Sequence, residues 1–336
     1  MLTATDQGRI VVGVDEAGYG PNLGPLVIAA TAWHVPSAFC EQSFIDLRKS
    51  HFLPLTWSEG CQHVPLGDSK QLYSPAVGLR TLEAGLLALL AQIQQVRERP
   101  MMTFRGVLER IALTSAGSWG PGENAWYQRL PETLPLIHSS EEIDRLAGLA
   151  NQRLAGLGIR LLAVRASIIT ESHFNQMANR LGSKGRLLAT VTMDLVGELF
   201  SQSLCHLQGC SSEIFCDRQG GRKKYSCVLL EAMPEEWFDT LSETPMRSSY
   251  RRLRQPEQKF HFSVGGDSFP PTALASMTAK YIRERLMASI NDYWSGHVAD
   301  LKPTAGYPND AKRFRLQIQA TADRLGHDSA DWWRVC

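Results

Sequence analysis

The sequence predicts an α/β fold in which a mixed central sheet is flanked by helices. The run Arg9–Val14 is apolar and rich in β-branched residues, and Leu26–Trp33 is a second run of the same kind. Glycines and prolines between them break regular structure, so the two runs are interpreted as a hairpin-like pair of buried strands. Further along the chain, short apolar runs alternate with stretches of helical spacing. Strands first, then strands interleaved with helices, indicate a mixed sheet with helices packed on it.

Hydrophobic periodicity predicts the remaining elements. Short apolar runs indicate further strands at Arg160–Ile169, Glu213–Cys216 and Lys259–Val264. Apolar residues at helical spacing indicate helices over Leu79–Val96, Ser140–Leu157, Leu188–Leu199 and about Thr272–Asn291. Ser140, with Asp144 nearby, is a suitable start for the second of these helices.

The composition is that of an ordinary folded protein and not of a strongly basic one. Of the 336 residues, 43% are hydrophobic and 21% are charged, which allows a sizeable core. The formal net charge is only +1. A nucleic-acid partner therefore requires basic residues that are clustered locally.

The chain shows neither a membrane segment nor a disulfide framework. No apolar run is long enough to span a bilayer, and the first apolar stretch soon meets acidic residues, unlike a signal peptide. The seven cysteines are odd in number and scattered, and Cys205, His206, Cys210 and Cys216 match no standard zinc-finger spacing. We therefore expect reduced thiols, a cytoplasmic location and no membrane association.

Four carboxylates stand at or just after the ends of predicted strands. Asp15 and Glu16 close the first strand, Asp217 ends a later one, and Asp267 follows another and two glycines. Acids at buried strand ends are costly unless a cation compensates them, and hard oxygen ligands suit Mg²⁺ or Mn²⁺. Neighbouring side chains on a strand point to opposite faces. Asp15 and Glu16 therefore serve one site only if Glu16 already lies in the turn.

The alternative interpretation is that these acids cap turns and helices, as an aspartate before a glycine-rich turn usually does. Their shared placement at strand ends weighs against that interpretation. Spacing alone leaves both open, and the surrounding motifs are needed to choose between them.

Several blocks resemble type 2 ribonucleases H (ribonuclease HII). Val14–Pro25, VDEAGYGPNLGP, closely resembles the signature DEAGRGPxxGP that opens that family, and Gly67–Leu72, GDSKQL, resembles its DSKKL segment. Gly266–Met287 resembles the family segment GDxxxPxIAAASIxAKxxRDRxM, and Gly306 with Tyr307 resembles its later GYGT motif. The blocks occur in the order that the family has.

The resemblance implies a ribonuclease H-like fold over residues 1–336 as a single catalytic domain. It implies a nuclease that cuts the RNA strand of RNA–DNA hybrids, or ribonucleotides embedded in DNA, and leaves 3′-hydroxyl and 5′-phosphate ends. The family's four acids carry over to Asp15, Glu16, Asp217 and Asp267, which would hold two Mg²⁺ or Mn²⁺ ions, with Asp15 bridging them. Asp217 stands in FCDRQGG, where the family usually has VDG.

The resemblance also assigns substrate contacts. These are Gly18, Tyr19, Gly20, Lys70, Lys280, Arg283 and Tyr307. Tyr19 replaces the family's arginine, so this turn lacks the guanidinium that grips the substrate backbone. Lys280 and Arg283 share a helix face, and the alternative to phosphate contact is that they pair with Glu284 on a solvated face. The basic runs within 218–224 and 247–254 are expected to give a local nucleic-acid surface.

Two segments have no family counterpart that we identify, and these residues, 100–158 and 222–258, are predicted to be insertions. Residues 300–336, which include Gly306 and Tyr307, are predicted to form a C-terminal helical extension. The expected partner is nucleic acid, and no obligate protein partner is implied. One alternative is a nuclease of the same fold that acts on DNA or structured RNA, and another is an inactive nucleic-acid-binding homologue. A nucleotide-binding loop is disfavoured, because no GxxxxGK[ST] follows and acids before the turn would repel phosphate.

Overall fold

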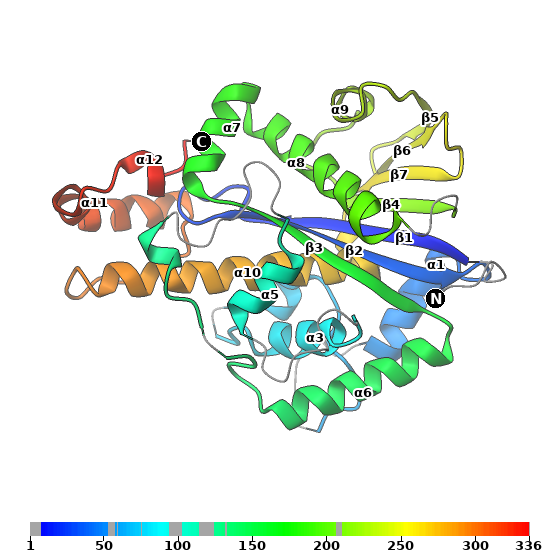
Figure 1. Ribbon diagram of the computed structural model, residues 1–336, viewed down its shortest axis with the longest axis horizontal. Coiled ribbons are helices and arrows are strands. Elements are labelled where there is room, and N and C mark those ends of the chain that lie inside the picture. The colour runs from blue at the N-terminus through cyan, green and yellow to red at the C-terminus, as the bar shows by residue number, and fades with distance from the viewer. Residues whose placement is uncertain are drawn as a thin grey trace.

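The computed structural model describes residues 8–52, 58, 60–74, 76–93, 103–113, 124–131, 133–205 and 210–335, with the backbone alone at 50, 51 and 267. Figure 1 shows one central sheet with helices on both faces. Within the described residues no helix is both long and apolar enough to cross a membrane.

Seven strands form the sheet in the described part of the chain, in the order β3-β2-β1-β4-β7-β6-β5. Their bounds are β1 Gly8–Ala17, β2 Leu26–Pro36, β3 Arg160–Ile169, β4 Ser212–Asp217, β5 Phe238–Glu243, β6 Arg247–Arg252 and β7 Gln258–Ser263. β1, β4 and β7 run parallel to one another, whereas the β1–β2, β2–β3, β5–β6 and β6–β7 pairs are antiparallel. The predicted mixed sheet flanked by helices is therefore confirmed.

The first strand continues further than the sequence suggested. β1 pairs with β2 without a register break as far as Ala17 opposite Val27. Glu16 therefore lies within the strand, and the condition that it lies in the turn, on which a site shared with Asp15 was made to depend, is not met. The parallel pairing with β4 stops earlier, at Val14 opposite Cys216. Asp15 and Glu16 thus occupy a stretch that is paired on one side only, at the sheet edge where β4 also ends.

The long helix α10, Pro270–Ser295, packs closely across one face of the sheet (Figure 1). A Cβ added at Gly13 of β1 would lie 2.1 Å from the backbone of Pro271, so only glycine permits this approach. The hydroxyl of Thr31 in β2 donates a 2.7 Å hydrogen bond to the carbonyl of Pro271. These contacts fix the start of α10 beneath the centre of β1 and β2.

The opposite face is covered by α7, Glu171–Leu181, α8, Lys184–Glu198, and α9, Ser226–Ala232. Two hydrophobic cores result, one on each side of the sheet. Val11 of β1 and Phe215 of β4 belong to the core beside α10, whereas Val12 and Val14 belong to the other. Side chains along the strands therefore alternate between the two cores, as a sheet buried on both faces requires.

The remaining helices surround these layers. They are α1 Glu41–Leu47, α2 Ser69–Leu72, α3 Arg80–Leu90, α5 Phe104–Ile111, α6 Ser140–Gly156, α11 Pro308–Leu325 and α12 Ser329–Trp332. The N-cap of α6 is Ser139, whose hydroxyl accepts from the amide of Glu142, one residue before the predicted start. From this N-cap position, a serine oxygen can reach the amides of the first turn that have no partner within the helix.

The described parts of the two predicted insertions and of the predicted C-terminal extension form regular secondary structure that packs against the rest of the chain. Residues 222–258 supply α9 and the β5–β6 hairpin, which continues the sheet beyond β7. Residues 100–158 include α5 and α6, and α6 packs against α3. Residues 300–336 supply α11 and α12, and Figure 1 shows both beside the far end of α10. That residues 100–158 and 222–258 are insertions, and that residues 300–336 are an extension, remain predictions.

Candidate metal centre and the glycine loop

Three of the four predicted carboxylates lie at one edge of the sheet. Asp15 and Glu16 stand near the end of β1, and Asp217 is the last residue of the neighbouring parallel strand β4. By the alternation of the strands, Asp15 and Asp217 point toward the face of α10, while Glu16 points toward the other face. The carboxylates therefore approach this edge from both sides of the sheet.

Burial and like charge raise the pKa values of two of these acids. The pKa of Asp15 is well above its usual value, because the carboxyl is buried and Glu16 and Asp217 lie close to it. A hydrogen bond with Ser276 of α10 opposes that shift. The pKa of Glu16 rises to about 7, through burial and then the charge of Asp217. The three carboxylates therefore form one electrostatic cluster.

The fourth predicted acid, Asp267, lies in the short 3₁₀ turn Gly266–Ser268 that follows β7. The amide of Gly266 donates a 3.0 Å hydrogen bond to Oδ1 of Asp217, so the backbone beside Asp267 touches the cluster. A Cβ at Gly266 would lie 3.3 Å from the Cα of Asp217, so the backbone of this turn packs tightly against the end of β4. The side chain of Asp267 lies outside the described residues. His206, which was considered with three cysteines as a zinc cluster, also lies outside them.

The donor chemistry of the cluster fits a hard divalent cation. Its atoms are carboxylate oxygens, and the positive charge that opposes the raised pKa of Glu16 comes from Lys70. Among the side chains that the structure describes, no three Asp, Glu, His or Cys groups already surround a single point. Bound cations would remove the repulsion that the cluster carries, since mutual repulsion and burial both favour the neutral acids.

The residues Gly18–Gly24, here called the glycine loop, leave the end of β1 beside these acids. Gly18 has φ +89° and Gly24 has φ +86°, a region that side-chain-bearing residues avoid. The loop is tied at its far end, where Asn22 and Leu23 donate their amides to the carbonyl of Gly306, at 2.8 and 3.2 Å. Its conformation is thus set by contacts with segments that are distant in sequence.

Tyr19 projects toward α8 and the segment after β4. The ammonium of Lys184 lies 5.4 Å from the centre of its ring. Burial and then the charge of Glu16 raise the pKa of the Tyr19 hydroxyl, while Arg222 and Arg334 act in the opposite sense. Cations that the loop itself lacks are therefore supplied beside Tyr19 by other elements.

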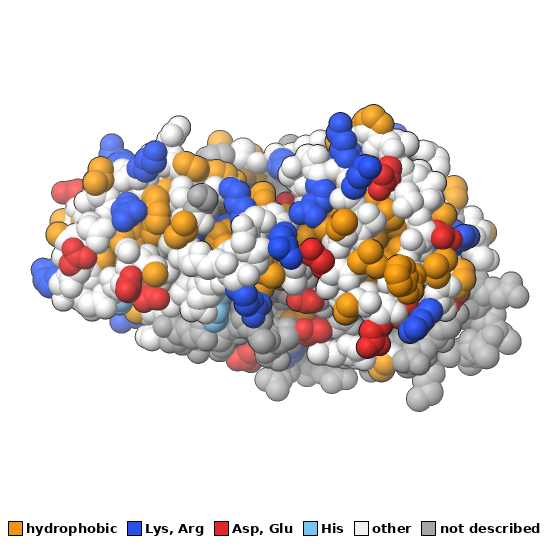
Figure 2. Space-filling view, turned by 90° about the horizontal axis from the view of Figure 1, so that it is seen from above, with side chains coloured by type: hydrophobic (Ala, Val, Ile, Leu, Met, Phe, Trp, Pro, Cys, Tyr) orange, Lys and Arg blue, Asp and Glu red, His pale blue; other side chains and the backbone are white. Residues whose placement is uncertain are grey.

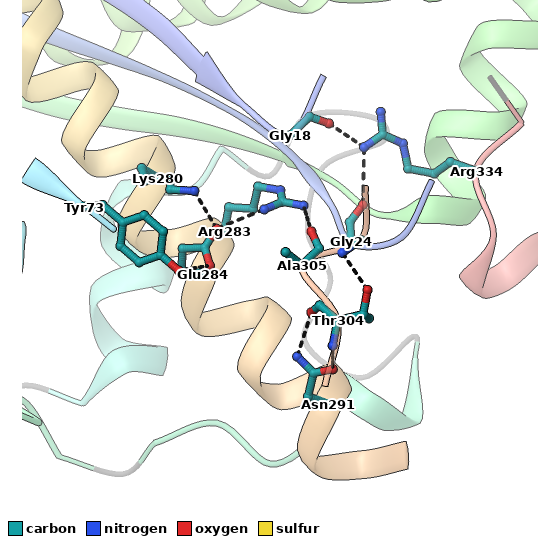
Figure 3. A network of polar contacts seen from close by, with 11 residues as sticks. Gly18, Gly24, Tyr73, Lys280, Arg283, Glu284, Asn291, Thr304, Ala305 and Arg334 are labelled. Carbon is teal, nitrogen blue, oxygen red and sulfur yellow. Dashed lines mark hydrogen bonds and ion pairs between the residues drawn. The ribbon is translucent and has the colours of Figure 1, made fainter. Parts of the chain in front are cut away.

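Lys280 and Arg283 on α10 both pair with Glu284, as Figure 3 shows. Nζ of Lys280 lies 2.8 Å from the Glu284 carboxylate and over the ring of Tyr73. The Arg283 side chain is only 1% exposed, so its surroundings are those of the protein interior. It donates to the carbonyl of Ala305 at 2.9 Å.

Tyr307 and Lys70 differ from this pair in exposure. The side chain of Tyr307 is 52% exposed and lies near the Arg283 guanidinium, 5.7 Å from ring centre to carbon. Lys70 is exposed in α2, whose first turn is capped by Asp68. Both side chains are therefore accessible at the rim of the site.

Most arginines of the basic runs already have acidic or carbonyl partners. Arg247 pairs with Glu41. Arg251 pairs with Asp239, and Arg252 with Glu236, each at 2.7 Å. Figure 2 shows one face of the molecule, on which Lys and Arg side chains are interspersed with Asp and Glu side chains. The run 247–254 therefore provides less free positive charge than its sequence suggests.

Sequence reasoning missed two residues that hold the glycine loop, Arg334 and Glu171. The Arg334 guanidinium donates to carbonyls of the loop, and the Glu171 carboxylate accepts from the amide of Gly24 at 3.1 Å. Burial raises the pKa of Glu171 to about 7. Nothing in the sequence near either residue matches a motif, because their role depends on contacts across more than a hundred residues.

Comparison with known proteins gives likenesses in three dimensions only. No family model matches the chain, and no curated protein matches it. Three solved structures that it resembles are ribonuclease H2 from Pyrococcus horikoshii OT3, ribonuclease HII in a complex with PCNA from Archaeoglobus fulgidus, and ribonuclease H3 from Aquifex aeolicus.

Their identities to the chain are 14%, 13% and 11%, and their TM-scores are 0.41, 0.42 and 0.35. The matches cover 96%, 97% and 98% of this chain, and 92%, 94% and 72% of the others. At these values the likeness decides nothing about the chemistry, which is inferred from the residues themselves.

Proposed function

We propose that this chain is a divalent-metal-dependent endonuclease of the ribonuclease H type. Its proposed substrates are RNA–DNA hybrids or DNA that contains single ribonucleotides, and its products carry 3′-hydroxyl and 5′-phosphate ends. The observation that carries the proposal is the cluster of Asp15, Glu16 and Asp217 at one sheet edge, where burial and like charge raise the pKa values of Asp15 and Glu16. Buried acids without enough countercharge are costly, and such sites are favoured where a cation or a reaction needs them.

Asp15, Glu16, Asp217 and Asp267 are the residues that would hold two Mg²⁺ or Mn²⁺ ions. When bound, such ions supply Lewis-acid chemistry, activating water and stabilising charge at a phosphodiester. The chain supports this arrangement from behind. The hydrogen bond between Ser276 and Asp15 orients that carboxylate, and the Ser276 hydroxyl also lies 2.9 Å from the hydroxyl of Ser69 in the GDSKQL segment. Two of the sequence blocks therefore meet beneath the acids.

The glycine loop is the proposed reader of the substrate. Backbone amides in such a turn can hydrogen-bond a ribose hydroxyl, the group that distinguishes RNA from DNA. The accessible side chains of Lys70 and Tyr307 at the rim would contact the backbone or a sugar. Arg283, buried as it is, would act from beneath as a support for the neighbouring backbone rather than as a direct phosphate contact.

The nearest alternative is a nuclease of the same fold that acts on DNA or structured RNA. The replacement of the signature arginine by Tyr19, with Lys184 beside its ring, is the observation that favours it. Both functions use the same acids. They differ in whether the 2′-hydroxyl is required.

Cleavage of three labelled duplexes separates these functions. The duplexes are all-DNA, an RNA–DNA hybrid, and DNA with one ribonucleotide, each incubated with Mg²⁺ and with a chelator. We expect Mg²⁺-dependent cutting of the hybrid, the single-ribonucleotide duplex or both, and no cutting of all-DNA. Efficient cutting of the all-DNA duplex would instead establish the alternative nuclease.

A further inference from the structure

A fully buried arginine from outside every sequence block holds the carbonyl side of the glycine loop. Arg334 follows α12, and its side chain has no exposed surface. Nη1 donates to the carbonyl of Gly18 at 2.5 Å, with a longer contact to that of Gly24 at 3.4 Å, and Nη2 donates to Tyr19 at 3.1 Å. Figure 3 shows the guanidinium between Gly18 and Gly24.

The guanidinium is itself held in place. Its central carbon lies 3.7 Å from the centre of the Phe174 ring on α7. The backbone on either side is anchored by Asn175, which donates to the carbonyls of Ala330 and Trp333 and accepts from the amide of Val335 at 2.8 Å. The backbone of Arg334 also bonds the loop directly, because its amide donates to the carbonyl of Asn22 at 2.8 Å.

The amides of the glycine loop differ in whether the protein supplies an acceptor for them. The amides of Asn22 and Leu23 bond Gly306, and that of Gly24 bonds Glu171. Within the described residues, the amides of Gly18, Tyr19 and Gly20 donate to no protein acceptor. The loop is therefore arranged with its first carbonyls facing Arg334 and its first three amides unused by the fold.

We propose that Arg334 is a positioning residue for substrate recognition, an inference that rests on the proposed function. By binding the carbonyls of Gly18 and Tyr19 it fixes their peptide planes, so that the neighbouring amides are presented to the ribonucleotide. Arginine suits this task because its planar fork donates in several directions at once and stays charged when buried. Lysine is a point donor on a flexible stem and cannot reproduce the fork.

Two measurements on the full chain test this role. Arg334→Met and Arg334→Lys remove or reduce the fork, and Arg315→Met is the matched control. Arg315 stacks on Trp333 of the same segment, at 4.8 Å, without bonding the loop. The first measurement is hydrogen–deuterium exchange of peptides covering residues 13–25. The second is steady-state cleavage of the single-ribonucleotide duplex.

We expect exchange at residues 18–24 to rise about tenfold or more in both Arg334 variants and to remain unchanged in Arg315→Met. The KM for the single-ribonucleotide duplex should rise about tenfold while kcat changes by less than about threefold, since the acids precede the loop. Arg334→Lys, which keeps the charge, carries the test if Arg334→Met does not fold.

A general loss of melting temperature with no selective exchange at 18–24, or with KM unchanged, would show that Arg334 only stabilises the fold and would overturn the proposal. If the wild type cuts no ribonucleotide-containing duplex, the proposed function fails. The exchange measurement then still decides whether Arg334 sets the conformation of the loop.

Discussion

Two regions of the molecule concentrate charge, the acids at the ends of β1 and β4 and the arginines of β6. The arginines are paired with side chains of opposite charge, whereas the acids lie beside one another. Each β6 arginine meets an acid, and Arg252 and Arg247 lower the pKa values of their partners Glu236 and Glu41. The pKa values of Asp15 and Glu16 are instead raised. Charge that the fold has paired stabilises structure, whereas charge left unpaired and buried marks a place where a ligand is expected.

The largest expected effect compares one acid from each region. Asp15→Asn should lower cleavage of a ribonucleotide-containing duplex by about a thousandfold, because an amide oxygen replaces a charged ligand. Asp239→Asn, which removes the partner of Arg251 in the β5–β6 hairpin, should leave cleavage within about twofold of the wild type. Metal-free Asp15→Asn should also melt at a higher temperature than the wild type, because a buried, repelled charge is gone. Wild-type cleavage by Asp15→Asn would show that the unpaired cluster is not catalytic.

The next effect is on the pH dependence of stability. The pKa values of Glu16 and Glu171 are raised from 4.5 to about 7, so the folded chain holds these protons more tightly than the unfolded chain. Without metal, the contribution of these two acids to the free energy of unfolding should therefore be greatest below pH 4.5 and be lost as the pH rises through 7. Glu171 alone would contribute about 3 kcal/mol to that loss. Urea titrations from pH 4.5 to 8 measure it.

Two comparisons sharpen that measurement. Glu171→Gln should reduce the change of the free energy of unfolding with pH, since it removes an acid whose pKa is raised at the glycine loop. Mg²⁺ should raise the melting temperature more at pH 8 than at pH 5.5, because metal and protons compete for the same carboxylates. A wild-type stability that falls no more steeply between pH 4.5 and 8 than that of Glu171→Gln would be inconsistent with a raised pKa at Glu171.

The smallest effect concerns the paired region. A double-mutant cycle with Arg252→Met and Glu236→Gln should give a coupling of about 1 kcal/mol, as expected for a partly exposed ion pair. Neither variant should alter cleavage. A loss of cleavage in Arg252→Met would mean that this run contacts the substrate despite its acidic partner, and would weaken the contrast between the two regions.

The sequence was sufficient where local pattern decides structure. The bounds of β3 are those predicted, and β1, β2, β4 and β7 differ from prediction by a few residues at their ends. Apolar runs and glycine-rich breaks are local signals, so they can be recognised in the sequence without knowledge of the fold. The length of β1 was misjudged because pairing with β2 extends a strand past the point at which its own residues stop being apolar.

The sequence was insufficient where partners are distant. The arginines between 247 and 254 look like free basic surface until the fold brings Glu41 and the acids near β5 beside them. Arg334 likewise carries no signal, because its role exists only when α12 packs against α7 beside the glycine loop. Ion pairs between distant residues and side-chain bonds to a distant backbone depend on tertiary contacts, and neither produces a periodic pattern in the sequence.

The central claim is that the unpaired carboxylates form the metal centre, and anomalous diffraction from crystals soaked in Mn²⁺ tests it most directly. The account predicts anomalous peaks bounded by Asp15, Glu16, Asp217 and Asp267, and their loss in Asp15→Asn crystals. Peaks that lie only elsewhere in the molecule, or no peak at a Mn²⁺ concentration that supports cleavage, would contradict it.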